Sequence, residues 1–257
     1  MTNIYSELNR VFNCGEEAAL CTIVKTKGSA PRRIGAKMIV YADGRICGTI
    51  GGGALEKEVI KNAIETIKNK KPDLYRHDLV QQLNMCCGGT VDIYIEPVMK
   101  KNNLYIFGAG HVGQALARYA LNTDFQVFMI DDRIEFLDVV TESEINKMNL
   151  HYSQALPILP FDERTFVCIM TYDHAMDRDI LAYCLKKPHA YLGMIGSKRK
   201  VEITKKKFEQ GMIAETDELE EVDMPMGIDI LAEGPDEIAI SILAQLIKVK
   251  NTKIYAK

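Results

Sequence analysis

A glycine pattern in the second half of the chain, G-x-G-x-x-G at Gly108, Gly110 and Gly113, constrains the fold more than any other feature. It follows the apolar stretch 104–107 and opens an amphipathic segment, and the next apolar stretch ends at Asp131. In dinucleotide-binding folds these glycines permit a tight turn, the approach of a pyrophosphate and close helix packing, while the acid binds a ribose hydroxyl. The pattern predicts a Rossmann-like parallel-sheet domain, with the three glycines and Asp131 as nucleotide-binding candidates.

Two other side chains near this motif are binding candidates. His111 lies inside the loop, where nucleotide sites usually have an inert residue, and Arg133 follows Asp131 by two positions. An arginine there could stack on a base or take an extra phosphate. The alternative is a sheet that keeps its glycines for packing and binds no nucleotide.

The rest of the second half fits the same architecture. Short, nearly continuous apolar stretches are typical of strands buried on both faces, and their alternation with helical segments indicates βαβ units. The last helix opens at Pro235 with acidic residues in its first turn, and its broad apolar face predicts core packing, with a homodimer interface as the alternative. We expect the acidic run 215–223 to be a solvated loop. The expected strands are 104–107, 126–131, 165–170 and 190–195, with helices at 114–120 and 177–187.

The first half has a different pattern and predicts a small α+β domain. The turn signal at 42–44 lies between two predicted strands and indicates a hairpin, and apolar residues recur at helical spacing after a triple glycine. Pro97 and the polar run after it predict a boundary near residue 100, which divides the chain into domains 1–100 and 101–257. The expected elements are a helix at 7–13 and strands at 19–25, 37–41, 45–50, 74–78 and 91–96.

A second glycine loop, Gly51, Gly52 and Gly53, opens the helix of the first domain. Consecutive backbone N–H groups at a helix start favour an anion, although tight packing of hairpin on helix explains three glycines as well. Upstream lie Arg32 and Arg33 in a loop of small residues. Adjacent arginines can clamp a phosphate or carboxylate, and the alternative is two solvated surface charges.

Adjacent cysteines, Cys86 and Cys87, precede a Gly-Gly pair near the end of the first domain. A single pair with no second C-x-x-C gives little support to a tetrahedral zinc site. Accessible thiols beside backbone donors suit a nucleophile, a soft-metal ligand or a sulfur carrier. The alternative for each cysteine is a small buried hydrophobic residue. In the second domain, His174 and the aspartates around it suggest either a metal or acid–base cluster or a polar loop that caps a helix.

The whole chain of 257 residues carries a net charge of −3, which gives no basic field for nucleic acid. Its start lacks the pattern of a signal peptide, and no apolar stretch reaches the roughly 20 residues of a membrane span. The seven cysteines are an odd number and suit a reducing compartment. We therefore expect a cytoplasmic protein without nucleic-acid or membrane partners.

Several phrases, in order, resemble the XdhC/CoxI family of accessory factors for molybdenum hydroxylases such as xanthine dehydrogenase. The first domain contributes GSAPRRIGAKMIV, DGRICGTIGGGALE and MCCGG. The second contributes FGAGHVGQALA, DDR, YLGMIGSKRK and GPDEIAISILAQLI. The resemblance covers nearly the whole chain and implies a small N-terminal domain joined to a C-terminal Rossmann domain.

The resemblance also implies a function. Family members are thought to bind the molybdenum cofactor (molybdopterin or its dinucleotide form), to support its sulfuration and to insert it into the hydroxylase apoenzyme, with a cysteine desulfurase as sulfur donor. On this basis Arg32, Arg33 and Gly51 to Gly53 hold the phosphate-bearing part, while Cys86 or Cys87 faces the molybdenum. The loop at Gly108 to Gly113 holds a nucleotide portion or a separate NAD(P).

Two function classes follow from these observations. The first is a maturation factor, or chaperone, that binds a pterin and shows no turnover of its own. From the residues alone, an NAD(P)-dependent oxidoreductase that uses the G-x-G-x-x-G loop is the alternative, and it would turn over a nicotinamide cofactor with a small substrate.

Overall fold

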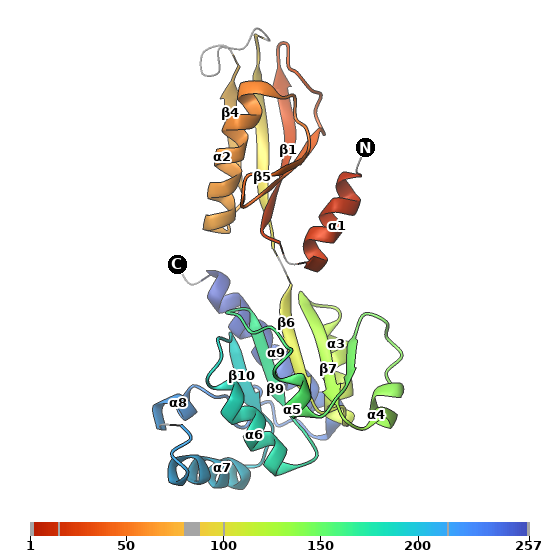
Figure 1. Ribbon diagram of the computed structural model, residues 1–257, viewed down its shortest axis with the longest axis vertical. Coiled ribbons are helices and arrows are strands. Elements are labelled where there is room, and N and C mark those ends of the chain that lie inside the picture. Colours follow the sequence, from red (N-terminus) through yellow and green to blue (C-terminus); the bar gives the residue numbers. More distant parts are fainter. Residues whose placement is uncertain (1–2, 15, 80–87, 100, 215, 256–257) are drawn as a thin grey trace. The chain divides into compact units, whose positions relative to one another are not determined.

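The computed structural model describes residues 3–14, 16–79, 88–99, 101–214 and 216–255. Two compact units divide the chain, Met1–Lys101 and Asn102–Lys257 (Figure 1). Each unit has its own sheet and its own hydrophobic core, so each is described by itself.

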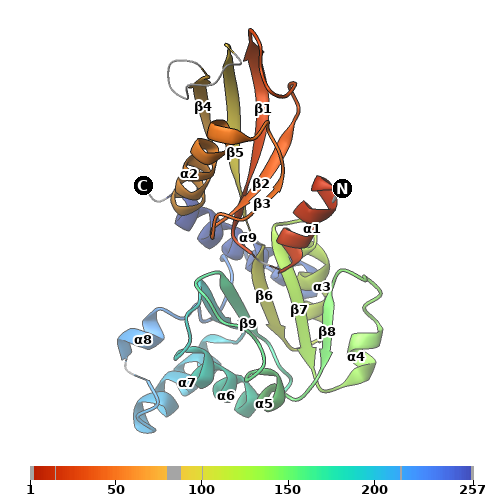
Figure 2. The same ribbon diagram turned by 45° about the horizontal axis from the view of Figure 1, so that its top comes forward.

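The first unit is built on a five-stranded antiparallel sheet in the order β3-β2-β1-β5-β4. The long central strand β1 pairs with β2 on one side and with β5 on the other. A register shift between Ile23 and Lys25 interrupts the pairing of β1 with β5. The strands are β1 (Ala18–Lys27), β2 (Lys37–Tyr41), β3 (Ile46–Gly48), β4 (Asp73–Asp78) and β5 (Thr90–Val98), and Figure 2 labels all five.

Alternation along these strands gives the first unit two apolar faces. Ala19, Cys21 and Ile23 of β1 point to one face, which packs against helix α2 (Gly53–Asn69). Leu20 of the same strand points to the other face, where the shorter helix α1 (Ile4–Cys14) packs. The expected small α+β domain is therefore confirmed.

The second unit contains a five-stranded parallel sheet in the order β10-β9-β6-β7-β8. Counted from its first strand, this order is 5-4-1-2-3, the order of a Rossmann-type half in which the topology reverses between the first and fourth strands. The predicted Rossmann-like sheet is confirmed. The strands are β6 (Asn102–Phe107), β7 (Phe125–Asp131), β8 (Asn146–Asn149), β9 (Thr165–Ile169) and β10 (Tyr191–Met194).

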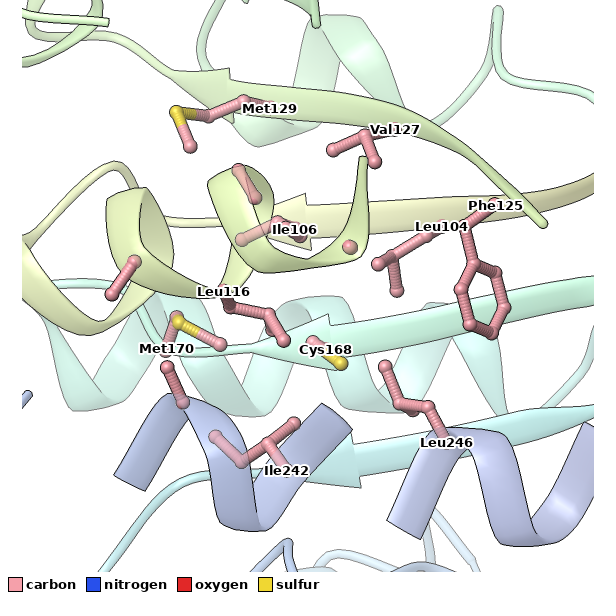
Figure 3. Packing of buried hydrophobic residues seen from close by; sticks show 14 of the residues in the cluster. Leu104, Ile106, Leu116, Phe125, Val127, Met129, Cys168, Met170, Ile242 and Leu246 are labelled. Atoms are coloured by element: carbon pink, nitrogen blue, oxygen red, sulfur yellow. The ribbon is translucent and has the colours of Figure 1, made fainter. Parts of the chain in front are cut away.

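Helices cover both faces of the parallel sheet, which explains why its strands are apolar on both sides. Leu116 of α3 and Ile242 and Leu246 of α9 pack on one face, together with inward side chains of β6, β7 and β9 (Figure 3). The other face carries α5, α6 and α7. The helices are α3 (His111–Ala120), α4 (Ile134–Asp138), α5 (Tyr152–Ala155), α6 (His174–Cys184), α7 (Lys198–Gln210), α8 (Thr216–Glu220) and α9 (Gly234–Tyr255).

One sequence expectation of the second unit is wrong. The acidic run 215–223 was expected to be a solvated loop, but it contains the short helix α8, and Leu219 and Val222 are buried against the sheet. Asp223 then exchanges backbone hydrogen bonds with edge strand β10. The many charged residues of this run obscured two apolar residues, Leu219 and Val222, which are three positions apart and buried. Among the described helices, none is long and apolar enough for a membrane span.

Candidate functional site

Three sequence motifs of the first unit lie against one another. A side chain on Gly51 would come within 2.6 Å of the ring carbons of Pro31, and one on Gly89 would come within 2.5 Å of the carbonyl oxygens of Lys27 and Ser29. The loop that carries the two arginines is therefore packed between the triple glycine and the Gly-Gly segment. Residues about 20 to 60 positions apart in the sequence can approach this closely because Gly51 and Gly89 have no Cβ.

The triple-glycine loop already contains an internal anion. Glu56, in the first turn of α2, accepts hydrogen bonds from the backbone N–H groups of Gly52 at 2.9 Å and Ile50 at 3.1 Å, and from the Thr49 hydroxyl. Partial burial alone would raise the pKa of Glu56, but these hydrogen bonds outweigh it and the net effect lowers the pKa. Gly52 and Gly53 both adopt positive φ, and among the described residues no atom outside the adjoining backbone lies within 4 Å of where their side chains would start. The outer side of the loop is open.

Arg32 and Arg33 are exposed, and neither side chain has a hydrogen bond or ion pair within the described part of the chain. They belong to a basic segment, 25–42, that contains five cations (Lys25, Lys27, Arg32, Arg33 and Lys37) and no acid. By contrast, Arg10, Arg45 and Arg76 of the same unit are all paired with carboxylates. The two motif arginines are thus available to an external anion.

Cys86 and Cys87 lie outside the described residues, so their assignment stays a prediction. Among the described residues, burial separates three thiols from reactive ones. It raises the pKa of Cys21 and of Cys184 to about 12, and it also raises the pKa of Cys168. These three cysteines are core residues, as the contacts of Cys168 illustrate (Figure 3).

In the second unit, the G-x-G-x-x-G loop connects β6 to α3, and its glycines have separate roles. Side chains at Gly108 and Gly113 would collide with backbone oxygens, at 2.3 Å from Met170 and at 2.1 Å from Gly108 respectively. Gly110 differs, since its φ of −67° suits any residue and, in the part of the chain that the structure describes, no atom beyond the adjoining backbone lies within 4 Å of a Cβ there. The exposed His111 is the first residue of α3. Close packing therefore requires glycine at positions 108 and 113, but it does not require glycine at position 110.

The acid of the motif is engaged within the protein. Asp131 ends β7, its side chain is 2% exposed, and it forms an ion pair with Arg133 at 2.8 Å. It also accepts a hydrogen bond of 2.7 Å from the Ala109 N–H in the glycine loop. Burial alone would raise the pKa of Asp131, but the hydrogen bonds from Arg133 and Ala109 outweigh it and lower the pKa.

The aspartates around His174 are helix-capping and structural, as the second of the two sequence interpretations predicts. Asp173 caps α6 by accepting a hydrogen bond from the Ala175 N–H at 2.7 Å. Asp177 is completely buried and binds Thr171 and Lys200, whose Nζ lies 2.6 Å from the carboxylate. Within the described residues no cluster of histidine, cysteine and acidic side chains could hold a metal ion.

Sequence reasoning missed Phe136, Tyr172 and Lys200. The rings of Phe136 and Tyr172 both lie against the Arg133 guanidinium, whose central carbon is 4.0 and 4.1 Å from their centres. The available signal was positional, since each aromatic residue follows a strand, β7 or β9, and these strands flank β6. Lys200 was visible as the last residue of YLGMIGSKRK, but nothing in the sequence identified Asp177 as its partner.

Two family models match the chain. One, described as the XdhC and CoxI family, matches residues 13–78, and the other, described as the XdhC Rossmann domain, matches residues 104–246. The second match alone covers more than half of the chain, and the two fall in different compact units.

Relatives extend over nearly the whole chain. The uncharacterized protein YqeB of Escherichia coli (strain K12) is 32% identical over 97% of this chain, which spans only 46% of the length of YqeB. A probable xanthine dehydrogenase subunit of Bacillus subtilis (strain 168) is 22% identical, with 98% of both proteins covered. The molybdenum cofactor insertion chaperone PaoD of Escherichia coli (strain K12) is 24% identical over 92% of this chain and 84% of PaoD.

A solved structure has a similar fold. The crystal structure of a xanthine dehydrogenase from Bacillus halodurans matches with a TM-score of 0.55 and 22% identity, covering 98% of this chain and 97% of the other. At this identity the likeness concerns the fold alone.

Proposed function

This chain belongs to the XdhC and CoxI family, and we propose that it binds the molybdenum cofactor and assists the maturation of a molybdenum hydroxylase. Support comes from two relatives, one named as a molybdenum cofactor insertion chaperone and the other as part of a probable xanthine dehydrogenase. The proposed cargo is a pterin that carries a phosphate or nucleotide tail and chelates molybdenum through two sulfurs.

The observation that carries the proposal is the meeting of three motifs in the first unit. Pro31, which precedes the two free arginines, packs on Gly51, and Ser29 packs on Gly89. Arginine forks recognise phosphate oxygens in pairs. In our proposal Arg32 and Arg33 bind the phosphate of the tail, and the open side of Gly52 and Gly53 lets the cargo approach the backbone.

Glu56 limits where that phosphate binds. Its carboxylate occupies the N–H groups of Ile50 and Gly52, so a phosphate at the same position would face a like charge. The tail therefore binds on the arginine side of the loop, with Glu56 holding the loop in shape. This assignment gives the two arginines most of the anion affinity.

The sulfur end of the cargo is assigned to Cys86 or Cys87. A thiolate is a suitable ligand for molybdenum or a carrier of the terminal sulfur, which a cysteine desulfurase would supply before insertion into the apoenzyme. The chain itself needs no turnover for this role. The alternative role as an NAD(P)-dependent oxidoreductase receives little support from Asp131, which Arg133 and Ala109 already engage.

The proposal is tested by reconstitution of a cofactor-free hydroxylase. The chain is loaded with cofactor and mixed with apoenzyme, and recovered hydroxylase activity is measured for the wild type and for Arg32→Ala/Arg33→Ala. We expect the double variant to lose at least tenfold in activation, because two charge-assisted hydrogen bonds contribute about 3 kcal/mol or more.

A matched control removes the same charge elsewhere. Lys68→Ala/Lys71→Ala deletes two exposed cations at the opposite end of α2 and should activate the apoenzyme as the wild type does. Equal losses in both double variants would show a non-specific charge effect and refute the assignment to Arg32 and Arg33. Full activation by the arginine variant would refute it as well.

A further inference from the structure

Arg133 occupies the place where a nucleotide fold receives its adenosine. The residue follows β7, and its Nε and one terminal nitrogen donate to the two carboxylate oxygens of Asp131 at 2.9 and 2.8 Å. Its guanidinium carbon lies 4.0 Å from the ring centre of Phe136 and 4.1 Å from that of Tyr172. The planar cation thus contacts two aromatic rings, each at a favourable cation–π distance.

The acceptor capacity of Asp131 is used completely. A carboxylate offers about four lone-pair positions. One oxygen accepts the Arg133 N–H at 3.0 Å and the Arg133 Nε, while the other accepts the Ala109 N–H at 2.7 Å and the terminal nitrogen of Arg133. In dinucleotide-binding folds the acid at this position binds the ribose hydroxyl, so no acceptor remains here for that contact.

A small cavity also lies beside Asp131, and neither Arg133 nor Phe136 lines it. The cavity bordered by Gly108, Asp131, His151 and Tyr172 has a volume of about 20 Å³, which is room for one or two water molecules. Sites for small organic ligands span roughly 300 Å³ or more. The other end of the motif is different, because the backbone at Gly110 is open. The phosphate end of the fold is accessible while the ribose and base end is closed.

A hydrogen bond to Asp132 also fixes the position of Tyr172. The tyrosine comes from the loop after β9, and its hydroxyl donates to Asp132 at 3.2 Å. Three consecutive residues at the end of β7 therefore act together. Asp131 is the acid of the motif, Asp132 accepts the hydrogen bond from Tyr172, and Arg133 pairs with Asp131.

We propose that Arg133 is an internal plug of the adenosine subsite in this Rossmann-like unit. While Arg133 is paired with Asp131, the unit does not bind NAD(H) or NADP(H), and an adenine nucleotide enters only when that ion pair opens. The chain thus has the complete glycine and acid pattern of a dinucleotide site, while Arg133 occupies the space that the adenosine of such a ligand would need. It is independent of cofactor binding by the first unit.

Calorimetric titration of the full chain with NADH, NADPH and ADP-ribose tests the plug. We expect the wild type to bind all three with a Kd weaker than about 1 mM. We expect Arg133→Ala to bind ADP-ribose at least tenfold more tightly, because the substitution frees both Asp131 and the space beside the two aromatic rings. Arg133→Lys keeps a cation beside the buried acid, so it should fold even if the alanine variant does not, and its affinity should lie between the two. Arg199→Ala removes an exposed arginine and should match the wild type.

Two results would overturn the proposal. Micromolar binding of a dinucleotide by the wild type, weakened in Arg133→Ala, would make Arg133 a ligand-binding residue. Equal affinities in the wild type, Arg133→Ala and Arg133→Lys would show that Arg133 does not control the subsite.

Discussion

Asp131 makes the stability of the second unit depend on pH. Its pKa in the folded protein is lowered below the ordinary value of 3.8, so its contribution to stability is complete above that value and is lost as the pH falls through the lower, folded pKa. We expect Asp131→Asn to reduce the free energy of unfolding by about 2 kcal/mol at pH 7, the size of a hydrogen-bonded charge interaction. Urea denaturation of both proteins at several pH values should show this difference shrink below about pH 4. A difference that stays constant down to pH 3 would contradict the assignment.

Two glycines of one motif should respond differently to the same substitution. Gly113→Ala would place a methyl group 2.1 Å from a backbone oxygen, and we expect a loss of about 3 kcal/mol or more. Gly110→Ala meets open space at an ordinary φ and should cost about 1 kcal/mol or less, since alanine is only a poorer N-cap than glycine. Thermal or urea unfolding compares the two. Similar losses would mean that Gly110 is also retained for packing.

At the scale of elements, a buried ion pair ties the start of α7 to α6 and to the loop after β9. Lys200 bonds Asp177 and the carbonyl of Ile195, and Asp177 also bonds Thr171. Lys200→Met leaves a buried carboxylate without its cation, so we expect a loss of about 3 to 5 kcal/mol in unfolding free energy. Asp177→Asn/Lys200→Met should recover part of that loss. The exposed Lys198→Met is the control and should change stability by about 0.5 kcal/mol or less.

If Lys200→Met and Lys198→Met were equally stable, the ion pair would have no role in joining these elements. A double variant less stable than Lys200→Met would likewise show that the two side chains do not act as a pair.

The same scale shows what sequence patterns could and could not predict. The strands with continuous or alternating apolar residues, such as β2 and β9, were predicted within about one residue because burial dictates their composition. The polar edge strand β8 was not predicted, since its four residues include no strongly apolar run. The sequence places Glu56 in the first turn of its helix and Asp131 at the end of its strand, but it does not show that each carboxylate already accepts an N–H group of its own glycine loop.

At the scale of the whole molecule, the two units should fold separately. Each has its own sheet and its own buried clusters, two in each unit among the described residues. We expect a fragment of residues 102–257 to fold alone, with helical circular dichroism and a cooperative thermal transition. A fragment without a cooperative transition would show that the second unit depends on the first.

The candidate site illustrates the limit of sequence analysis at this scale. The family resemblance predicted that Arg32, Arg33 and the triple glycine act together, but no periodicity reveals that Pro31 packs on Gly51 or that Gly89 packs on Ser29. Such contacts depend on tertiary distance. The family resemblance supplied the function that spacing and charge alone did not, because the G-x-G-x-x-G pattern by itself favours a nicotinamide enzyme.

The most direct test of the account is the content of the protein itself. The chain is purified under reducing, oxygen-free conditions from cells that make the molybdenum cofactor, and bound molybdenum is measured by mass spectrometry and released pterin by fluorescence after oxidation. The account predicts about one pterin per chain in the wild type and much less in Arg32→Ala/Arg33→Ala. Protein that contains neither pterin nor molybdenum, under conditions where a control molybdenum enzyme retains both, would contradict it.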